Sequence, residues 1–301
     1  MYTHLVVPLD GSSYAEHALA YAALIARHGG ARLDLALVHT SYLVGTLDGS
    51  IAATVERWQT EQREREATYL HEVAARLARV GGVEARPVLL TGAVAAALEA
   101  HVRGSGADLV VMTTHGRSGL QRAWLGSVAD ALVRHVGVPV LLVRPNDQEP
   151  VLGEERPLFR HLALALDGSA AAERAVATAL ALADAETRFT LLRVVAPPRA
   201  PTSSFLPHAA HLNELLLQER LSEAAEYLDR RAQRLRALGR TVDTQVLVDV
   251  QAAHAIVRWA AANGADGIAL STDGRNPALR LLLGSVQRDV VRAGALPVLV
   301  G

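Results

Sequence analysis

In the stretch HLVVPLDGSSYAEHAL (residues 4–19), an Asp-Gly-Ser turn joins a short apolar run to a helical pattern. The same skeleton returns 157 positions later as HLALALDGSAAAERAV (161–176). A second pair of stretches, TTHGRSGLQRAWLGS (113–127) and STDGRNPALRLLLGS (271–285), repeats at an offset of 158. A nearly constant offset over two separate motifs indicates that a whole domain is duplicated.

Each copy alternates apolar runs with helical patterns, including a long charged pattern at 55–80 and at 212–238. The runs are continuously apolar, which is typical of parallel strands covered by helices on both faces. We therefore expect an α/β fold of two tandem, Rossmann-like domains, each with five strands and four helices. The domains are predicted at 1–146 and 158–301, with a linker at 147–157 that is rich in proline and charge.

The composition excludes several classes of protein. Thirty basic residues against 31 acidic residues leave a formal charge of −1, which argues against nucleic acid as the main partner. No apolar run approaches the roughly 20 residues of a membrane span, and the first residues lack an export signal. We expect a protein of the cytoplasm with no membrane segment.

The chain has no cysteine, and all 30 of its basic residues are arginine. A thiolate nucleophile, a zinc site with cysteine ligands, the lysine of a P-loop and a Schiff-base lysine are thereby excluded. The twelve histidines form no metal-binding motif, and His208 and His211, three apart, do not make a site. We expect His39 to be packed or hydrogen-bonded rather than catalytic.

The two repeated motifs fall where a parallel sheet binds ligands, at the carboxyl ends of its strands. Asp10 ends the first strand, and the glycine loop follows Met112 at the end of the fourth. Gly126 and Ser127 begin a helix whose free N–H groups favour phosphate. A carboxylate such as Asp10 accepts hydrogen bonds from ribose hydroxyls or adenine N–H groups, so a nucleotide fits this arrangement.

Two further loop residues belong to the predicted phosphate site: Gly116 allows close approach of the backbone to an anion, and Arg117 extends toward the phosphates. A purely structural reading of the turn stays open beside this one. In that reading Asp10 and Ser12 cap the following helix, and Ser13 forms a capping box with Glu16.

The residues quoted above carry a resemblance to a known family. The whole chain resembles a tandem universal stress protein, through VVPLDGSSYAEHAL (6–19), VVMTTHGRSGLQRAWLGSVADALVRHVGVPVLLVRP (110–145) and their second copies. The resemblance implies the strand order 3-2-1-4-5 in each domain. It also implies that two such domains pair through their last strands, which makes the tandem chain an internal pseudo-dimer and leaves a homodimer of chains possible.

Nucleotide-binding members of that family carry G-x-x-G, nine residues, and then G-S or G-T. In this sequence the first glycine is replaced in both copies by a small hydroxyl residue. The motif positions are Thr113, Gly116, Gly126 and Ser127 in the first copy and Ser271, Gly274, Gly284 and Ser285 in the second. The resemblance also assigns the first-strand acid to Asp10 and Asp167, and the adenine-facing backbone to Thr40 and Val194.

The two copies differ at other positions that the resemblance assigns to the site. A family glycine after the third strand is Gly92 in the first copy and is matched with Val250 in the second, which adds bulk. His115 becomes Asp273, an acid beside the predicted phosphates. We therefore expect the first domain to be the better site for ATP, with Mg²⁺ bound through the phosphates and no metal site on the protein itself.

Three functions remain open at this point. The first is a regulatory stress-response protein that binds adenine nucleotide and acts on unknown protein partners. The second is a nucleotide-independent module for dimerisation and protein interaction, which the altered first glycines favour. The third, a slow ATPase, is disfavoured because the loop has no lysine and no base placed by a motif, so we expect no catalytic residues and no enzyme.

Overall fold

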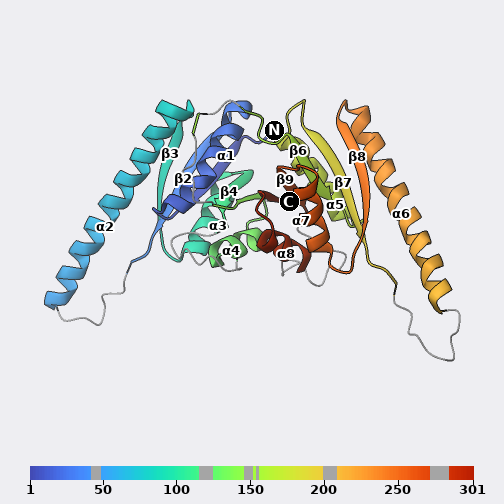
Figure 1. Cartoon of the computed structure of the whole chain (residues 1–301). Helices are drawn as coiled ribbons and strands as arrows, with labels where there is room; N and C mark the ends of the chain where they lie inside the picture. The colour runs from blue at the N-terminus through green and yellow to red at the C-terminus, as the bar shows by residue number, and fades with distance from the viewer. Residues whose placement is uncertain (42–48, 115–124, 146–151, 154–155, 199–208, 272–284) are drawn as a thin grey trace. The chain divides into compact units, whose positions relative to one another are not determined.

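The computed structural model describes residues 1–41, 49–114, 125–145, 152–153, 156–198, 209–271 and 285–301. The chain divides into two compact units, Met1–Leu158 (unit 1) and Phe159–Gly301 (unit 2), and each contains one copy of the repeat (Figure 1). The exact limits predicted for the domains and the linker stay a prediction.

Unit 1 alternates strands and helices along the chain. Its elements are β1 (His4–Leu9), α1 (Ser13–Gly29), β2 (Arg32–His39), α2 (Gly49–Arg76), a π-helical turn η1 (Leu77–Gly81), β3 (Ala85–Thr91), α3 (Val94–Ser105), β4 (Leu109–Thr113), α4 (Ser127–His135) and β5 (Val140–Val143).

Unit 2 repeats this alternation. Its elements are β6 (His161–Ala165), α5 (Ala170–Leu182), β7 (Arg188–Val195), α6 (Ala209–Ala237), β8 (Thr241–Val248), α7 (Ala252–Ala262), β9 (Gly267–Leu270), α8 (Ser285–Ala293) and β10 (Val298–Val300).

Within each unit the strands are parallel and have the same order. Unit 1 runs β3-β2-β1-β4-β5, and unit 2 runs β8-β7-β6-β9-β10. The predicted order 3-2-1-4-5 is confirmed in both copies. The winding direction therefore reverses between β1 and β4 in unit 1 and between β6 and β9 in unit 2, where open parallel sheets bind ligands.

Helices cover both faces of each sheet. Right-handed crossovers place the helices that connect β1, β2 and β3 on one face, and those that lead to β4 and β5 on the other. In agreement, α1 packs on β1 and β4, α2 packs on β2 and β3, and α3 packs against α4. The arrangement recurs in unit 2, where α7 packs against α8 and α6 packs on β7 and β8.

Burial explains why the central strands lack an alternating pattern. Every residue of β1 and β4 is buried, because helices cover both sides of the sheet. The edge strand β3 is only half-buried. Among the described residues, no helix is both long and apolar enough to span a membrane.

Candidate functional site

The carboxyl ends of β1 and β4 border a cavity of about 330 Å³ in unit 1. The starts of α1, α3 and α4 complete its wall through residues such as Ala15, Val94 and Ala129. Five residues predicted from the sequence line this cavity together: Asp10, Met112, Thr113, Gly126 and Ser127. Residues more than 100 positions apart in the chain thus meet at the switch point of the sheet.

Asp10 has a structural role in addition to its place in the cavity wall. Its Oδ1 accepts hydrogen bonds from the backbone N–H of Ser12 (2.9 Å) and from the Ser12 hydroxyl (2.6 Å). Ser12 is the N-cap of α1 and accepts from the N–H of Ala15 at 3.2 Å. The capping interpretation of this turn is therefore correct for Ser12, and it leaves Asp10 facing the cavity.

The predicted capping box between Ser13 and Glu16 is wrong. Ser13 is already the first helical residue, and the Glu16 carboxylate accepts a hydrogen bond from the Tyr69 hydroxyl (3.0 Å) and pairs with Arg76. Burial and the nearby Glu16 carboxylate raise the pKa of Tyr69. Glu16 thus links α1 to α2 through these two contacts and does not cap its own helix.

The N-terminus of α4 is open toward the cavity. Gly126 is the N-cap, and no side chain caps this helix. The N–H of Gly126 donates to the carbonyl of Thr114 (2.9 Å), and a Cβ at this position would lie 3.1 Å from the same oxygen. The first N–H groups of a helix have no acceptor within it, so Ser127 and its neighbours present donors suited to an anion.

The other predicted residues of unit 1 lie beside this cavity or outside the described residues. Thr40 is exposed just after β2. Gly92 follows β3, and its N–H donates to the carbonyl of His39 (3.2 Å). Neither residue lines the cavity. Gly116 and Arg117 lie outside the described residues, so their predicted contacts with phosphate stay predictions.

In unit 2 the Asp-Gly-Ser turn repeats closely. Asp167 Oδ1 accepts from the N–H of Ser169 (2.9 Å), and Ser169 caps α5. Ser271 is buried after β9, and Ser285 begins α8. Gly274, Gly284 and Asp273 lie outside the described residues.

Two of the predicted equivalences between the copies are corrected by strand pairing. His39 pairs with Thr91, and Val195 pairs with Val248. The residue that corresponds to Thr40 is therefore Ala196, two positions beyond Val194, which lies within β7.

The same pairing matches Gly92 with Asp249 and not with Val250. The N–H of Asp249 donates to the carbonyl of Val195 (3.2 Å), as that of Gly92 does to His39. The Asp249 side chain accepts from the N–H of Gln251 (2.9 Å) and from Arg258 (2.5 Å). The bulk that unit 2 adds after the third strand is thus a carboxylate.

The third residue of the helix after the glycine loop distinguishes the two copies most clearly. It is Ala129 in α4, which lines the cavity, and Gln287 in α8, which is 8% exposed. The Gln287 amide donates to the carbonyl of Ser271 at 2.8 Å. This side chain ties α8 to the end of β9 at the place that is hollow in unit 1. The sequence contained this difference, because Ala129 and Gln287 are separated by the repeat offset of 158 positions.

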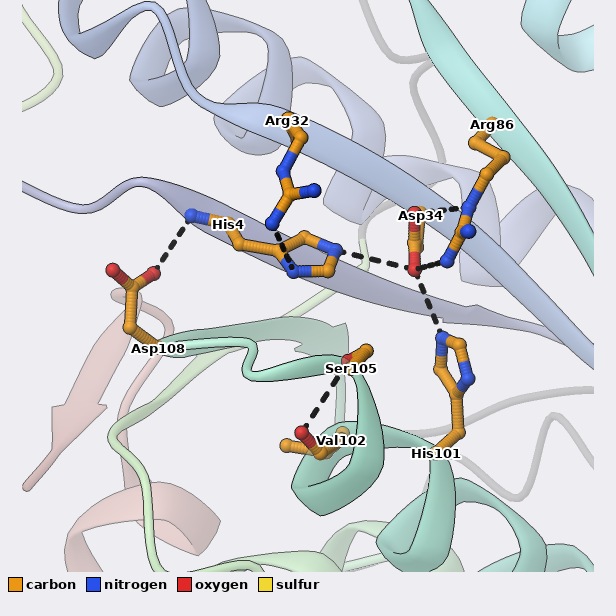
Figure 2. Close-up of polar contacts among 8 residues, drawn as sticks. All are labelled: His4, Arg32, Asp34, Arg86, His101, Val102, Ser105 and Asp108. Atoms are coloured by element: carbon orange, nitrogen blue, oxygen red, sulfur yellow. Dashed lines mark hydrogen bonds and ion pairs between the residues drawn. The ribbon is translucent and has the colours of Figure 1, made fainter.

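A buried carboxylate at the opposite end of the unit 1 sheet was not predicted (Figure 2). Asp34 on β2 is 2% exposed, and its carboxylate accepts hydrogen bonds from Nε and Nη2 of Arg86 (2.9 and 2.6 Å). His101 Nε2 lies 2.9 Å and His4 Nε2 lies 3.2 Å from its Oδ2. The signal in the sequence was an aspartate inside the apolar run LDLALVHT (33–40).

The ionisation of Asp34 follows from these contacts. Burial by itself would raise the pKa of Asp34, but hydrogen bonds from Arg86 and His101 and the charges of His4 and Arg86 outweigh burial and lower it. The same hydrogen bond raises the pKa of Arg86. This cluster lies at the amino ends of the strands, away from the cavity, and we assign it a structural role.

His39 is packed and hydrogen-bonded, as the sequence predicted. It is fully buried at the end of β2, and its Nδ1 lies 2.7 Å from Glu66 Oε2 on α2. No group of three potential metal ligands occurs among the described residues. His208 lies outside them, so the proposed absence of a site at His208 and His211 stays a prediction.

Comparison with known proteins identifies relatives for both units. The sequence model of the universal stress protein family matches residues 1–144 and 158–300. Universal stress protein MJ0531 of Methanocaldococcus jannaschii is 32% identical over 151 residues, which are 50% of this chain and 86% of that protein. Universal stress protein Rv2005c of Mycobacterium tuberculosis is 30% identical over 204 residues, 64% of this chain and 61% of that protein's length.

Solved structures match over nearly the whole chain. A universal stress protein from Archaeoglobus fulgidus superposes with a TM-score of 0.67 at 20% identity, covering 99% of this chain and 97% of that one. A protein of unknown function from Pseudomonas aeruginosa, PA1789, gives a TM-score of 0.62 at 18% identity, covering 99% and 92%. At these identities the likeness establishes a shared fold.

Proposed function

The chain belongs to the universal stress protein family, and we propose that it is a cytoplasmic regulatory protein whose unit 1 binds an adenine nucleotide. The observation that carries this proposal is the cavity at the switch point, where Asp10, Thr113 and the start of α4 meet. The expected ligand is ATP with Mg²⁺.

The donor set of the cavity suits a nucleotide. The uncapped N-terminus of α4 offers N–H groups and the positive end of a helix dipole to phosphate oxygens. Asp10 keeps acceptor capacity for ribose or adenine donors, since each carboxylate oxygen accepts more than one hydrogen bond. Mg²⁺ would be held through the phosphates, as it often is at protein sites.

The proposal assigns the stronger site to unit 1. In unit 2 the Gln287 side chain occupies the place of Ala129, and Asp249 replaces Gly92. Asp273, which the resemblance places beside the phosphates where unit 1 has His115, adds a carboxylate that would weaken anion binding. Unit 2 is therefore proposed to be weak or silent for nucleotide.

The test is calorimetric titration of the whole chain with Mg-ATP. We expect one site per chain, and we expect Ala129→Gln to weaken binding by more than about tenfold, because the longer side chain fills the cavity. Ala100→Gln, on an exposed position of α3, is the matched control and should leave binding unchanged. Gln287→Ala tests the converse and should improve binding in unit 2.

The outcomes separate the competing functions. ATP at about 100 times its Kd should stabilise the protein by about 2.7 kcal/mol, which is visible as a higher Tm. No binding at millimolar ATP would favour the nucleotide-independent interaction module, which the replacement of the first glycine by Thr113 and Ser271 supports. Release of phosphate from bound ATP would instead favour the slow ATPase.

A further inference from the structure

Unit 2 carries a charged residue at a strand position that is apolar in unit 1. Arg193 lies two residues before the end of β7, as Leu37 does in β2. Leu37 is 3% exposed and belongs to the core of unit 1, whereas Arg193 is half-buried. A guanidinium at such a place needs partners for its five N–H donors.

The surroundings of Arg193 leave those donors unused. Its guanidinium carbon lies 5.2 Å from the centre of the Tyr227 ring, a cation–π contact. Its Nη2 lies 3.5 Å from where a Cβ on Gly168 would be, which is ordinary van der Waals contact, and the positive φ of Gly168 (87°) favours glycine there. Within the described part of unit 2, Arg193 makes no hydrogen bond and no ion pair, whereas its neighbour Arg231 pairs with Glu173.

The Tyr227 hydroxyl is a second unused donor at the same place. It is buried and has no hydrogen-bond partner in the described residues. In unit 1 its counterpart Tyr69 donates to Glu16. In unit 2 the corresponding carboxylate, Glu173, is held by Arg231, so the tyrosine is left without its acceptor.

The side chains of Arg193 and Tyr227 line one cavity of about 620 Å³, together with the Gly168–Ser169 turn at the start of α5. Glu223, Glu226 and Arg230 of α6 form the remaining wall. Arg230 and Glu226 lie 3.6 Å apart and offset each other's charge, and Glu223 is exposed. Arg193 remains as a cation that no described carboxylate neutralises at ion-pair distance.

We propose that this cavity of unit 2 binds a phosphate group, with the Arg193 guanidinium and the Tyr227 hydroxyl as donors. A guanidinium matches the geometry of phosphate oxygens through paired hydrogen bonds. The positive end of the α5 dipole lies on the same side. This site is separate from the predicted glycine-loop site and does not depend on nucleotide binding by unit 1.

The test is calorimetric titration of the whole chain with inorganic phosphate and with glycerol 3-phosphate, at constant ionic strength. The first variant is Arg193→Leu, which introduces the residue of unit 1. We expect it to weaken binding at least tenfold, and Tyr227→Phe to weaken it several-fold. Arg234→Leu, which removes an exposed arginine of α6, is the charge-matched control and should change affinity less than twofold.

Each result decides the proposal. Tighter binding of glycerol 3-phosphate than of phosphate identifies a phosphate ester as the ligand class, and the reverse identifies the free ion. Absence of binding for both probes overturns the proposal, as does an equal loss in Arg193→Leu and Arg234→Leu, which would indicate general electrostatics. Phosphate binding lost in Ala129→Gln but kept in Arg193→Leu belongs to unit 1 and also overturns it.

A stability measurement separates a ligand-binding arginine from a packing arginine. Without phosphate, we expect Arg193→Leu to have a higher Tm than the wild type, because an unpaired half-buried charge is removed. Phosphate should raise the Tm of the wild type and not that of the variant. A lower Tm for Arg193→Leu together with unchanged phosphate affinity would show that Arg193 only packs on Tyr227.

Discussion

Unit 1 and unit 2 share the same strand order and backbone contacts, and they differ in the side chains that pack between the elements. Both begin with the same Asp-Gly-Ser turn, in which Ser12 or Ser169 caps the first helix. In both, an aspartate before the fourth strand accepts backbone N–H groups at the start of the first strand, through Asp108 in unit 1 and Asp266 in unit 2. These contacts are local or use backbone groups, and both units have them.

The differences concern side chains that meet across elements. The predicted nucleotide cavity of unit 1 is bordered by Ala129, whereas Gln287 bonds across the same place in unit 2. The His39–Glu66 hydrogen bond has the apolar pair Val195 and Ala224 as its counterpart. The comparison indicates that one fold can keep its backbone arrangement while a few positions change which side chains lie at the carboxyl ends of the strands.

The largest expected difference in stability concerns Asp34. Its counterpart is Thr190, which accepts or donates a hydrogen bond with His161 Nε2 at 2.8 Å. We expect Asp34→Asn to lower the free energy of unfolding of unit 1 by about 3 kcal/mol, because Arg86 and two histidines lose a buried carboxylate. Native-state hydrogen exchange measures each unit separately.

The control for this variant is Asp243→Asn in unit 2. Asp243 pairs with Arg188 at 2.6 Å, and both side chains are about half exposed. Such surface pairs contribute about 1 kcal/mol or less. Equal losses in the two units would show that burial of Asp34 has no energetic consequence.

The next effect comes from the buried pair of His39 and Glu66. Glu66→Ala should cost about 2 kcal/mol, because the buried imidazole loses its partner. The double variant His39→Val with Glu66→Ala reproduces the apolar pair of unit 2. We expect its loss of unfolding free energy to be smaller than the summed losses of the two single variants by about 1 kcal/mol or more. Strict additivity in the double-mutant cycle would contradict this, and the exposed Glu64→Ala serves as the neutral control.

A smaller and pH-dependent effect follows from the lowered pKa of Asp34. The unfolded chain has an aspartate pKa of about 3.9, and the folded value is lower. The ionised carboxylate therefore stabilises the fold above about pH 4, and this stabilisation is lost as the pH falls through the folded pKa. The gap in unfolding free energy between wild type and Asp34→Asn should narrow on acidification. Parallel curves from pH 6 to pH 2 would refute it.

The smallest expected effect tests what the two units share. Ser12→Ala and Ser169→Ala should each cost about 1 kcal/mol, since each removes an N-cap. Ser13→Ala, at the position of the rejected capping box, should cost less than about 0.5 kcal/mol because that side chain is exposed and caps nothing. Hydrogen exchange of α1 and α5 measures the stability lost in Ser12→Ala and Ser169→Ala. A loss of about 1 kcal/mol in Ser13→Ala would instead support the capping box.

Much of the candidate site could be predicted because its residues lie at strand ends. Asp10 and Thr113 follow or end neighbouring strands, and Gly126 is the N-cap of the next helix. Once the strand order is known, parallel strands bring such positions to one edge. The matches of Val194 and Val250 failed because the repeat offset changes between motifs, and only strand pairing identifies Ala196 and Asp249 as the equivalents.

The side-chain clusters lay beyond the reach of sequence patterns. His101 reaches Asp34 across 67 positions of sequence, and Tyr69 reaches Glu16 across 53. An isolated polar residue in an apolar strand indicates that a partner exists, because buried charges are paired. It does not indicate which helix supplies that partner.

The duplication, the alternation of strands and helices and the position of the predicted site can be inferred from the sequence, because they follow from periodicity and turn chemistry within short segments. Two features emerge only from the folded structure. A cavity borders Ala129 at the position where Gln287 forms a hydrogen bond in unit 2, and Arg193 and Tyr227 line a second cavity. The physical reason is that a side chain's contacts depend on register and packing between elements far apart in the chain, which no local pattern encodes.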